Sequence, residues 1–385
     1  MDRVFRGRRA RGATAAAQRT ESSMSITEAQ VQNALKELID PNTGKDFVST
    51  RSARNIRVDG ADVSVDIELG YPAKSQMDHL RRLAIACLRA IPGVGNVSVS
   101  VTQKIVSHAV QRGVKLLPGV KNIIAVASGK GGVGKSTTAV NLALALAAEG
   151  ATVGLLDADI YGPSQPQMLG ITGRPESPDG KSLAPMTAYG IQAMSIGFLI
   201  DVETPMVWRG PMVTSALEQL LTETRWDEVD YLVIDMPPGT GDIQLTLAQK
   251  VPVTGAVIVT TPQDIALLDA RKGLKMFEKV GIPILGIVEN MSLHTCSKCG
   301  HEEHIFGEGG GARMAADYDL EVLGSLPLAM QIREQADSGK PTVVSDPDGR
   351  VAEIYRDIAR KVAVKIADKA KDMTAKFPSI VVQNT

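Results

Sequence analysis

The segment 127–138 holds the residues of this chain whose types and spacing most clearly indicate chemistry. In it, four residues separate Gly129 from Gly134, Lys135 and Ser136, which is the spacing of a phosphate-binding P-loop. The glycines let backbone N–H groups converge on an anion, the lysine supplies charge to the outer phosphates, and the serine hydroxyl can bind Mg²⁺. We therefore expect a nucleotide to be bound by Gly129, Lys130, Gly131, Gly132, Val133, Gly134, Lys135, Ser136 and Thr137.

Two further apolar runs of the sequence end directly in aspartates. Asp157 and Asp159 follow one run, and Asp235 follows another. The carboxyl ends of parallel strands form the ligand-binding edge of a sheet, and an aspartate directly after a strand is where a P-loop protein holds Mg²⁺. We expect Asp235 to share that role with Ser136, and the glycine-containing segment 237–241 to act as a switch loop beside the γ-phosphate. Any one of these aspartates could instead cap a helix.

Cys296 and Cys299 form a second candidate site. Thiolates with this spacing can share one soft metal ion. His294, His301 and His304 lie close by in the sequence, so a zinc site closed within one chain is an alternative, and an unliganded or structural pair is another. Four thiolates around an iron–sulfur cluster would require two more cysteines, which a two-fold dimer would supply.

The elements that must position these residues are alternating strands and helices. An apolar strand over 122–127 precedes the P-loop, and an alanine- and leucine-rich helix over 139–149 follows it. The phosphates would then lie at a helix N-terminus, and a plain glycine turn is the weaker interpretation. Further apolar strands are expected at 153–156, 231–234, 256–259 and 284–288. The pattern predicts an α/β P-loop NTPase fold with a doubly wound, mostly parallel sheet.

The length of 385 residues predicts more than one domain. We expect a disordered leader at 1–24, a small α+β domain at 25–103, a linker at 104–120 and the ATPase domain at 121–385. The leader is rich in arginine, so it is either a targeting segment or an over-extended start. In the small domain, Thr27 and Gln30 form a predicted capping box, and Asp59-Gly60 a predicted hairpin turn.

Composition excludes several classes of function. A net charge of −1 gives no polyanion-binding signature, so no nucleic-acid partner is expected. No apolar run reaches the ~20 residues of a membrane span, so no membrane partner is expected. Three cysteines are too few for a disulfide scaffold, which favours a reducing cytoplasm.

A second lysine refines the P-loop prediction. Lys130, five residues before Lys135, makes the loop resemble the deviant P-loop of the SIMIBI ATPases, which include MinD, partition ATPases, the nitrogenase iron protein and the Mrp/ApbC proteins. The resemblance implies a homodimer in which Lys130 enters the partner's nucleotide site and stabilises charge on the transferring phosphoryl group. A solvated loop lysine is the alternative.

Other motifs resemble one branch of those ATPases, the Mrp/ApbC (Nbp-type) iron–sulfur cluster carriers. They occur in the order expected of that family, at 157–164, 208–212, 235–242, 289–291 and 305–310. The resemblance implies an ATPase that holds a bridging [4Fe–4S] cluster at its dimer interface and passes it to apo-proteins. The residue roles it implies are catalysis by Lys130, Lys135 and Asp159, Mg²⁺ binding by Ser136, Asp157 and Asp235, adenine recognition by Asn290, and cluster binding by Cys296 and Cys299.

Three observations leave alternatives open. Asn290 could equally be a turn asparagine. The small domain resembles that of iron–sulfur assembly factors, but the cysteine often found after the second strand is missing around Ser75, so docking or regulation is expected of it rather than metal handling. Cys87 is expected to be a buried small hydrophobe. The alternatives for the whole chain are a MinD-like positioning ATPase with structural zinc, and an adaptor with a vestigial ATPase.

Overall fold

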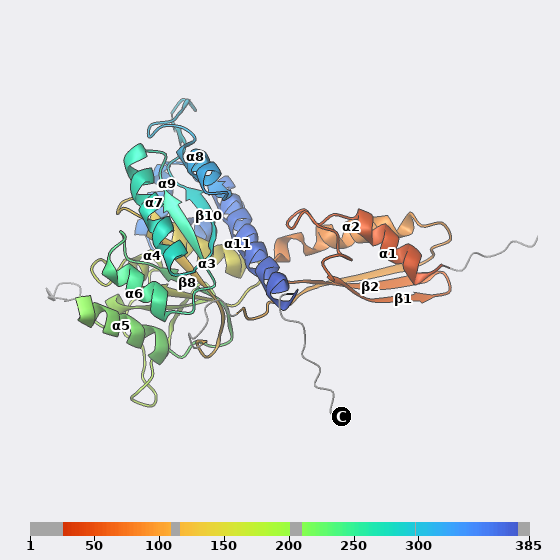
Figure 1. The fold of residues 1–385 in the computed structure, drawn as a ribbon, viewed down its shortest axis with the longest axis horizontal. Helices are drawn as coiled ribbons and strands as arrows, with labels where there is room; N and C mark the ends of the chain where they lie inside the picture. Colours follow the sequence, from red (N-terminus) through yellow and green to blue (C-terminus); the bar gives the residue numbers. More distant parts are fainter. Residues whose placement is uncertain (1–25, 109–115, 201–209, 297, 376–385) are drawn as a thin grey trace, which may run out of the picture.

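The computed structural model describes residues 26–108, 116–200, 210–296 and 298–375. Our expectations for the leader 1–24 and for residues 208 and 209 lie outside these ranges. The described residues form a large α/β unit and a smaller α+β unit that extends to one side of it (Figure 1).

The larger unit is built on one sheet, which within the described ranges has eight strands. In spatial order they are β13 (Val322–Ser325), β10 (Ile284–Glu289), β9 (Gly255–Thr260), β4 (Val120–Ala127), β8 (Val229–Asp235), β5 (Val153–Asp157), β7 (Ile191–Ser195) and β6 (Met186–Ala188). The short edge strand β6 pairs with β7 in antiparallel fashion, and the other pairings are parallel. The predicted doubly wound, mostly parallel sheet is confirmed.

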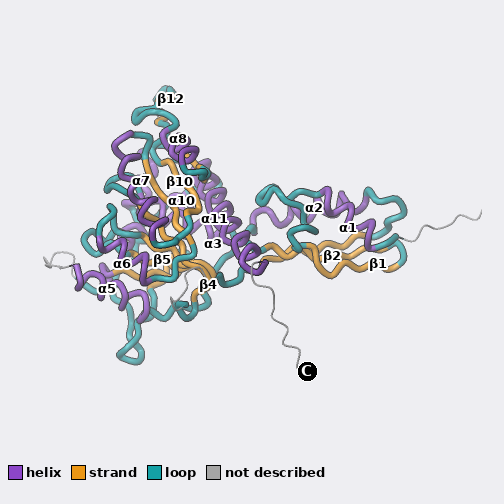
Figure 2. The backbone as a smooth tube through the Cα atoms, in the orientation of Figure 1, coloured by secondary structure: helices purple, strands orange, loops and turns teal. Residues whose placement is uncertain are grey.

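Helices cover both faces of this sheet. Alternate residues of β4 separate the two cores, because Ile124 and Val126 point to one face and Ile123 and Ala125 to the other. The first face is covered by α3 (Lys135–Ala148) and α11 (Arg350–Ala375), and the second by α5 (Gly210–Glu223), α6 (Asp242–Lys250), α7 (Asp264–Lys279) and α8 (Gly310–Asp317). Shorter helices are α4 (Gln165–Met168), α9 (Met330–Asp337) and α10 (Thr342–Ser345). The backbone trace in Figure 2 shows this layered arrangement.

The smaller unit has the predicted α+β composition. It contains α1 (Glu28–Glu37), β1 (Ala53–Asp59), β2 (Asp62–Leu69), the 3₁₀ turn η1 (Lys74–Gln76), α2 (Met77–Arg89) and β3 (Val97–Gln103). β1 and β2 form the expected hairpin, and β3 pairs with β2 in parallel. The capping box is present, with the Gln30 backbone N–H donating to Thr27 Oγ1 at 3.3 Å and the Thr27 N–H donating to Gln30 Oε1 at 2.9 Å.

The two units meet at the C-terminal end of α3. The fully buried Glu149 carboxylate accepts hydrogen bonds from Ser75 N and Oγ at 3.0 and 2.7 Å. It also forms an ion pair with Arg360 of α11. Next to it, Gln103 Nε2 donates to the Gly150 carbonyl at 2.6 Å. The buried apolar cluster of the small unit is continuous with the one beneath α3 and α11. The small unit is therefore docked through both polar and apolar contacts.

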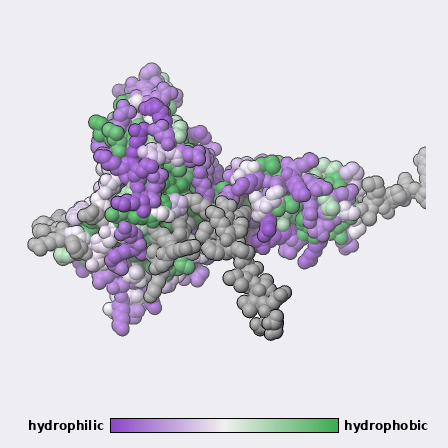
Figure 3. Space-filling model, in the orientation of Figure 1, coloured by the Kyte–Doolittle hydropathy of each residue, from purple (hydrophilic) through white to green (hydrophobic). Residues whose placement is uncertain are grey.

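The last helix contributes to this core rather than to a free surface. Ile358, Val362 and Ile366 of α11, spaced four residues apart, are fully buried, so the side of the helix on which they lie packs on the core. Among the helices of the described ranges, none is long and apolar enough to cross a bilayer. The face drawn in Figure 3 is mostly hydrophilic on both units.

Candidate nucleotide site and cysteine hairpin

The P-loop lies at the carboxyl end of β4 and runs directly into α3, which begins at Lys135. Gly132 and Gly134 have left-handed backbone conformations, with φ of +82° and +83°. Residues other than glycine rarely adopt this conformation. Gly129 serves packing instead: a Cβ atom there would lie 2.0 Å from the backbone carbon of Asp269 on α7. The glycines thus satisfy two separate constraints, loop conformation and close approach to a helix.

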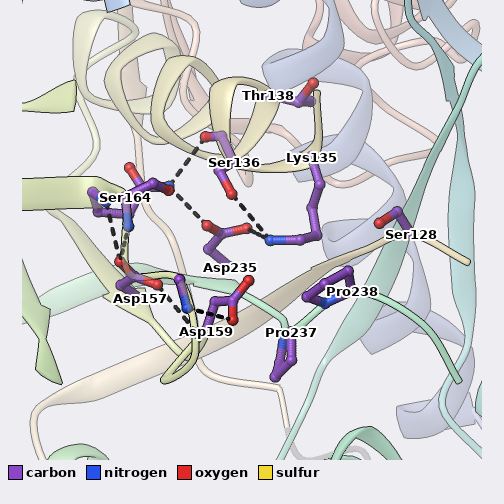
Figure 4. Close-up of polar contacts among 12 residues, drawn as sticks. Ser128, Lys135, Ser136, Thr138, Asp157, Asp159, Ser164, Asp235, Pro237 and Pro238 are labelled. Carbon is purple, nitrogen blue, oxygen red and sulfur yellow. Dashed lines mark hydrogen bonds and ion pairs between the residues drawn. The ribbon is translucent and has the colours of Figure 1, made fainter. Parts of the chain in front are cut away.

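The predicted lysine, serine and aspartate are brought together beneath this loop (Figure 4). The Lys135 ammonium forms a buried ion pair with Asp235 and approaches Ser136 Oγ at 3.1 Å. Lys135 is 6% exposed and Asp235 is 0% exposed. The ammonium therefore compensates a carboxylate that would otherwise be buried and uncompensated.

Gln165 belongs to the same cluster, and the sequence analysis missed it. Its Nε2 donates to Asp235 Oδ2 at 2.9 Å and to the Ser136 carbonyl at 3.1 Å. The side chain is 1% exposed and joins α4 to the P-loop helix and to β8. The available signal was its position eight residues after Asp157, which does not distinguish a site residue from a helix residue.

Asp157 organises the loop that follows β5. Its carboxylate accepts backbone N–H groups from Asp159, Ser164 and Gln165 and the hydroxyl of Ser195, at 3.0–3.1 Å. Complete burial, and then the nearby charge of Asp235, raise its pKa to about 7. Its predicted role near Mg²⁺ stays a prediction, and the contacts it makes position the loop that carries Asp159.

Asp159 is half-buried at the rim of the same cluster. It accepts the Gly162 N–H at 3.3 Å, and burial raises its pKa above the ordinary value. In Figure 4 it lies near Pro237, on the side of Asp235 away from α3. This position is compatible with orienting a water molecule, which remains a prediction.

The residues present fit a hydrated Mg²⁺ ion. Ser136 and Asp235 offer the oxygen ligands that this ion prefers. Beside them, Gln165 Oε1 and Ser164 Oγ are buried with no hydrogen-bond partner among the described residues. Unpaired buried oxygens call for a partner, and the water shell of Mg²⁺ would provide one.

The predicted switch loop folds back on the P-loop. Gly239, with φ +97°, donates its N–H to the Ser128 carbonyl at 3.1 Å. Gln244 Nε2 donates to the carbonyls of Pro237 and Pro238. A change in the conformation of this loop on nucleotide binding would therefore act directly on Ser128, the residue that follows β4.

Lys130 is exposed on the outer side of the loop. Only its carbonyl is engaged, by Ser128 Oγ at 3.0 Å, and its ammonium has no hydrogen bond or ion pair to the described residues. The predicted contact in trans remains a prediction, and the free ammonium would be available for it.

Asn290 lies against the P-loop, as part of its predicted site. Its Nδ2 donates to the Val133 carbonyl at 2.9 Å, while its Oδ1 accepts the Met291 N–H at 2.9 Å. Both amide atoms therefore have protein partners here, and adenine recognition stays a prediction.

The two cysteines lie at the tip of a hairpin formed by β11 (His294–Thr295) and β12 (Glu302–Glu303). Figure 2 shows β12 of this hairpin at one extremity of the large unit, beyond α8. Cys299 is exposed and Cys296 is half-buried. Backbone N–H groups of Lys298 and Cys299 lower the pKa of the Cys296 thiol, which favours the thiolate that binds metals.

Two of the neighbouring histidines, His294 and His304, form hydrogen bonds to backbone carbonyls at the base of the hairpin. His304 Nδ1 donates to the Ser292 carbonyl at 2.6 Å, and His294 Nδ1 to the Leu328 carbonyl at 3.0 Å. Among the side chains that the structure describes, no three potential ligands gather around one point. Cys87 is half-buried far from the hairpin, its thiol near the Ala34 carbonyl at 3.2 Å.

Comparison with known proteins agrees with this geometry. Residues 119–363 match the family described as NUBPL iron-transfer P-loop NTPase, and residues 28–101 match the iron–sulfur cluster assembly protein family. The chain is 64% identical over 271 residues to an iron–sulfur cluster carrier protein of Pseudomonas fragi, covering 70% of this chain and 94% of that protein. It is 50% identical over 345 residues to the Escherichia coli K12 carrier protein, covering 89% and 94%.

Two further relatives extend the comparison. A mouse iron–sulfur cluster transfer protein, NUBPL, is 54% identical over 254 residues, covering 66% of this chain and 80% of that protein. Among solved structures, a nucleotide-binding protein from Archaeoglobus fulgidus in complex with ADP is 38% identical with a TM-score of 0.53, covering 60% of this chain and 90% of that one.

Proposed function

Because the chain belongs to the NUBPL family of iron-transfer P-loop NTPases, we propose that it is an ATPase that carries an iron–sulfur cluster and delivers it to apo-proteins. One observation carries the proposal: the same domain holds a P-loop cluster of Lys135, Ser136 and Asp235 and an accessible cysteine pair on a separate hairpin. The Pseudomonas fragi and Escherichia coli relatives, which match most of the chain, are iron–sulfur cluster carrier proteins, and this supports the same function.

In the proposed ATP hydrolysis, the P-loop N–H groups and Lys135 hold the β- and γ-phosphates. Lys135 would exchange its ion pair with Asp235 for contacts with phosphate, which frees Asp235 and Ser136 to hold Mg²⁺. The ion supplies positive charge to the phosphates. Asp159 orients a water that attacks the γ-phosphorus, the bond to the β–γ bridging oxygen breaks, and ADP and phosphate leave. Lys130 of a second copy stabilises the charge that develops.

The cluster is cargo in this proposal. Cys296 and Cys299 supply two thiolates, and a second copy of the chain supplies two more, which makes the four of a [4Fe–4S] cluster. The homodimer that Lys130 requires and the homodimer that the cluster requires would then be the same assembly. Exposed thiols at this site have to stay reduced, so a reducing compartment such as the cytoplasm is proposed.

The test is anaerobic reconstitution with iron and sulfide, followed by metal analysis and absorbance. We expect about four iron atoms per dimer and broad absorbance at roughly 400 nm, as for a thiolate-bound cluster. Cys296→Ser and Cys299→Ser should each abolish the signal, and Cys87→Ser is the matched control that should keep it. One zinc per chain without iron uptake would reject the carrier function and favour a positioning ATPase.

A further inference from the structure

Asn290 connects the P-loop with the segment that leads to the cysteine hairpin. Its amide donates to the Val133 carbonyl at 2.9 Å. The approach is so close that a Cβ atom on Gly134 would lie 2.1 Å from Asn290 Nδ2. A movement of the peptide at Val133 or Gly134 would therefore displace the Asn290 side chain.

Met291, the residue after Asn290, forms the turn between β10 and the hairpin segment. Met291 has φ +57°, a left-handed conformation that non-glycine residues keep only when their surroundings impose it. Here the Met291 N–H is held by Asn290 Oδ1 at 2.9 Å, and the Asn290 N–H is held by the Thr260 carbonyl of β9 at 2.8 Å. The same amide thus contacts the P-loop and stabilises the turn that starts the hairpin segment.

The hairpin is attached to this turn by hydrogen bonds on both sides. Ser292 N and Oγ both donate to the Leu326 carbonyl at 3.0 Å, and Leu328 N donates to the Leu293 carbonyl at 2.8 Å. From the returning strand, His304 donates to the Ser292 carbonyl at 2.6 Å. Residues 292–304 are consequently held at their base by short polar contacts, and Cys296 lies six residues after Asn290.

We propose that Asn290 is a positioning residue through which the P-loop sets the placement of Cys296 and Cys299. Phosphates in the P-loop require its N–H groups to face the anion, so a nucleotide that reorients the Val133–Gly134 peptide would also move the Asn290 amide bonded to it. A ligand shifts a distant site only through such differential contacts. This inference rests on the proposed function, because it assumes a nucleotide at the P-loop.

The experiment measures thiol reactivity rather than cluster content. In a Cys87→Ser background, the metal-free, reduced protein is labelled with a maleimide, with and without saturating Mg²⁺–ADP. Binding is measured separately with a fluorescent ADP analogue. We expect ADP to change the labelling rate of the remaining cysteines by about fivefold, the size of an ordinary allosteric coupling.

Asn290→Ala, tested at an ADP concentration that its own titration shows to be saturating, should label at one rate with and without ADP. Asn290→Ser, which retains a polar group but cannot reach Val133, gives the same test if the alanine variant folds poorly. Asn96→Ala, an exposed asparagine of the small unit, is the matched control and should keep the full response.

Two results overturn the inference while leaving the nucleotide site intact. One is an unchanged labelling rate in the parent although the fluorescent ADP binds, and the other is a full response in Asn290→Ala. A parent protein that binds no ADP at all would reject the proposed function and this inference with it.

Discussion

Lys135 has two acceptors available, the Asp235 carboxylate and, in the proposed function, phosphate. Lys135→Ala should weaken nucleotide binding, since a hydrogen bond to a charged group contributes about 1.5–3 kcal/mol, which is ~10- to 100-fold in Kd. Lys130→Ala should bind nucleotide like the parent and lose hydrolysis, because its exposed ammonium makes no hydrogen bond or ion pair to the residues that the structure describes. Fluorescent ADP titration and phosphate release measure the two effects. Parent-like hydrolysis by the Lys130 variant would contradict the deviant-loop assignment.

Asp159 can be tested with asparagine, which removes the negative charge of the side chain and little else. Asp159→Asn keeps the shape of the side chain and can still accept the Gly162 N–H. ATP should bind, while turnover should fall ~10²-fold, the size of effect expected when a reacting group loses its correct positioning. Phosphate release under saturating ATP is the measurement. Parent-like turnover would move the role to Asp157 or Asp242.

The beginning of the linker is anchored to strand β4 by a histidine. His108 is buried, and its Nδ1 donates to Asn122 Oδ1 of β4 at 2.7 Å. Burial lowers the pKa of His108 below its ordinary value of 6.5. The unfolded chain therefore takes up a proton more readily than the folded chain as the pH falls below 6.5, so this contribution to stability is present at neutral pH and is lost in mild acid.

Urea unfolding at pH 7.5 and 5.5 tests this linkage. The parent should lose stability between the two values, and His108→Gln should lose less, because glutamine does not titrate. A pH dependence identical in both proteins would place the effect on other groups.

The sequence predicted the elements with strong local patterns. The P-loop flanks, the aspartates that end β5 and β8, and the capping box of α1 follow from spacing and periodicity, and the structure confirms where they lie. The short strands β6, β7 and β13 were not predicted, because these segments mix polar and apolar side chains and form no continuous apolar run. Gln165 was missed because its partners Asp235 and Ser136 are distant in sequence. The contact of Asn290 with the Val133 carbonyl likewise depends on β10 lying next to β9 in the sheet.

At the scale of the whole molecule, the docking of the small unit depends on a buried charge pair. Glu149→Ala leaves Arg360 buried without its main partner, and breaking a buried pair costs about 3–5 kcal/mol. We expect a lower unfolding midpoint and faster proteolysis between residues 104 and 119. The control is Lys45→Ala, which removes an exposed ion pair with Asp368 at 3.0 Å and should cost at most about 1 kcal/mol. Equal effects of the two variants would show that apolar packing alone holds the units together.

The same contact has a consequence for the order in which the chain is made. Arg360 approaches Ser75 from 285 positions later in the sequence, and α11, which carries it, also covers α3. A ribosome releases the small unit first, and domains generally fold as they emerge. Its contacts with Glu149 and Gly150 become possible once α3 has been made, but Arg360 completes the docking only when almost the whole chain has been translated. A nascent chain stopped before α11 would lack both the docking arginine and the cover of one face of the sheet.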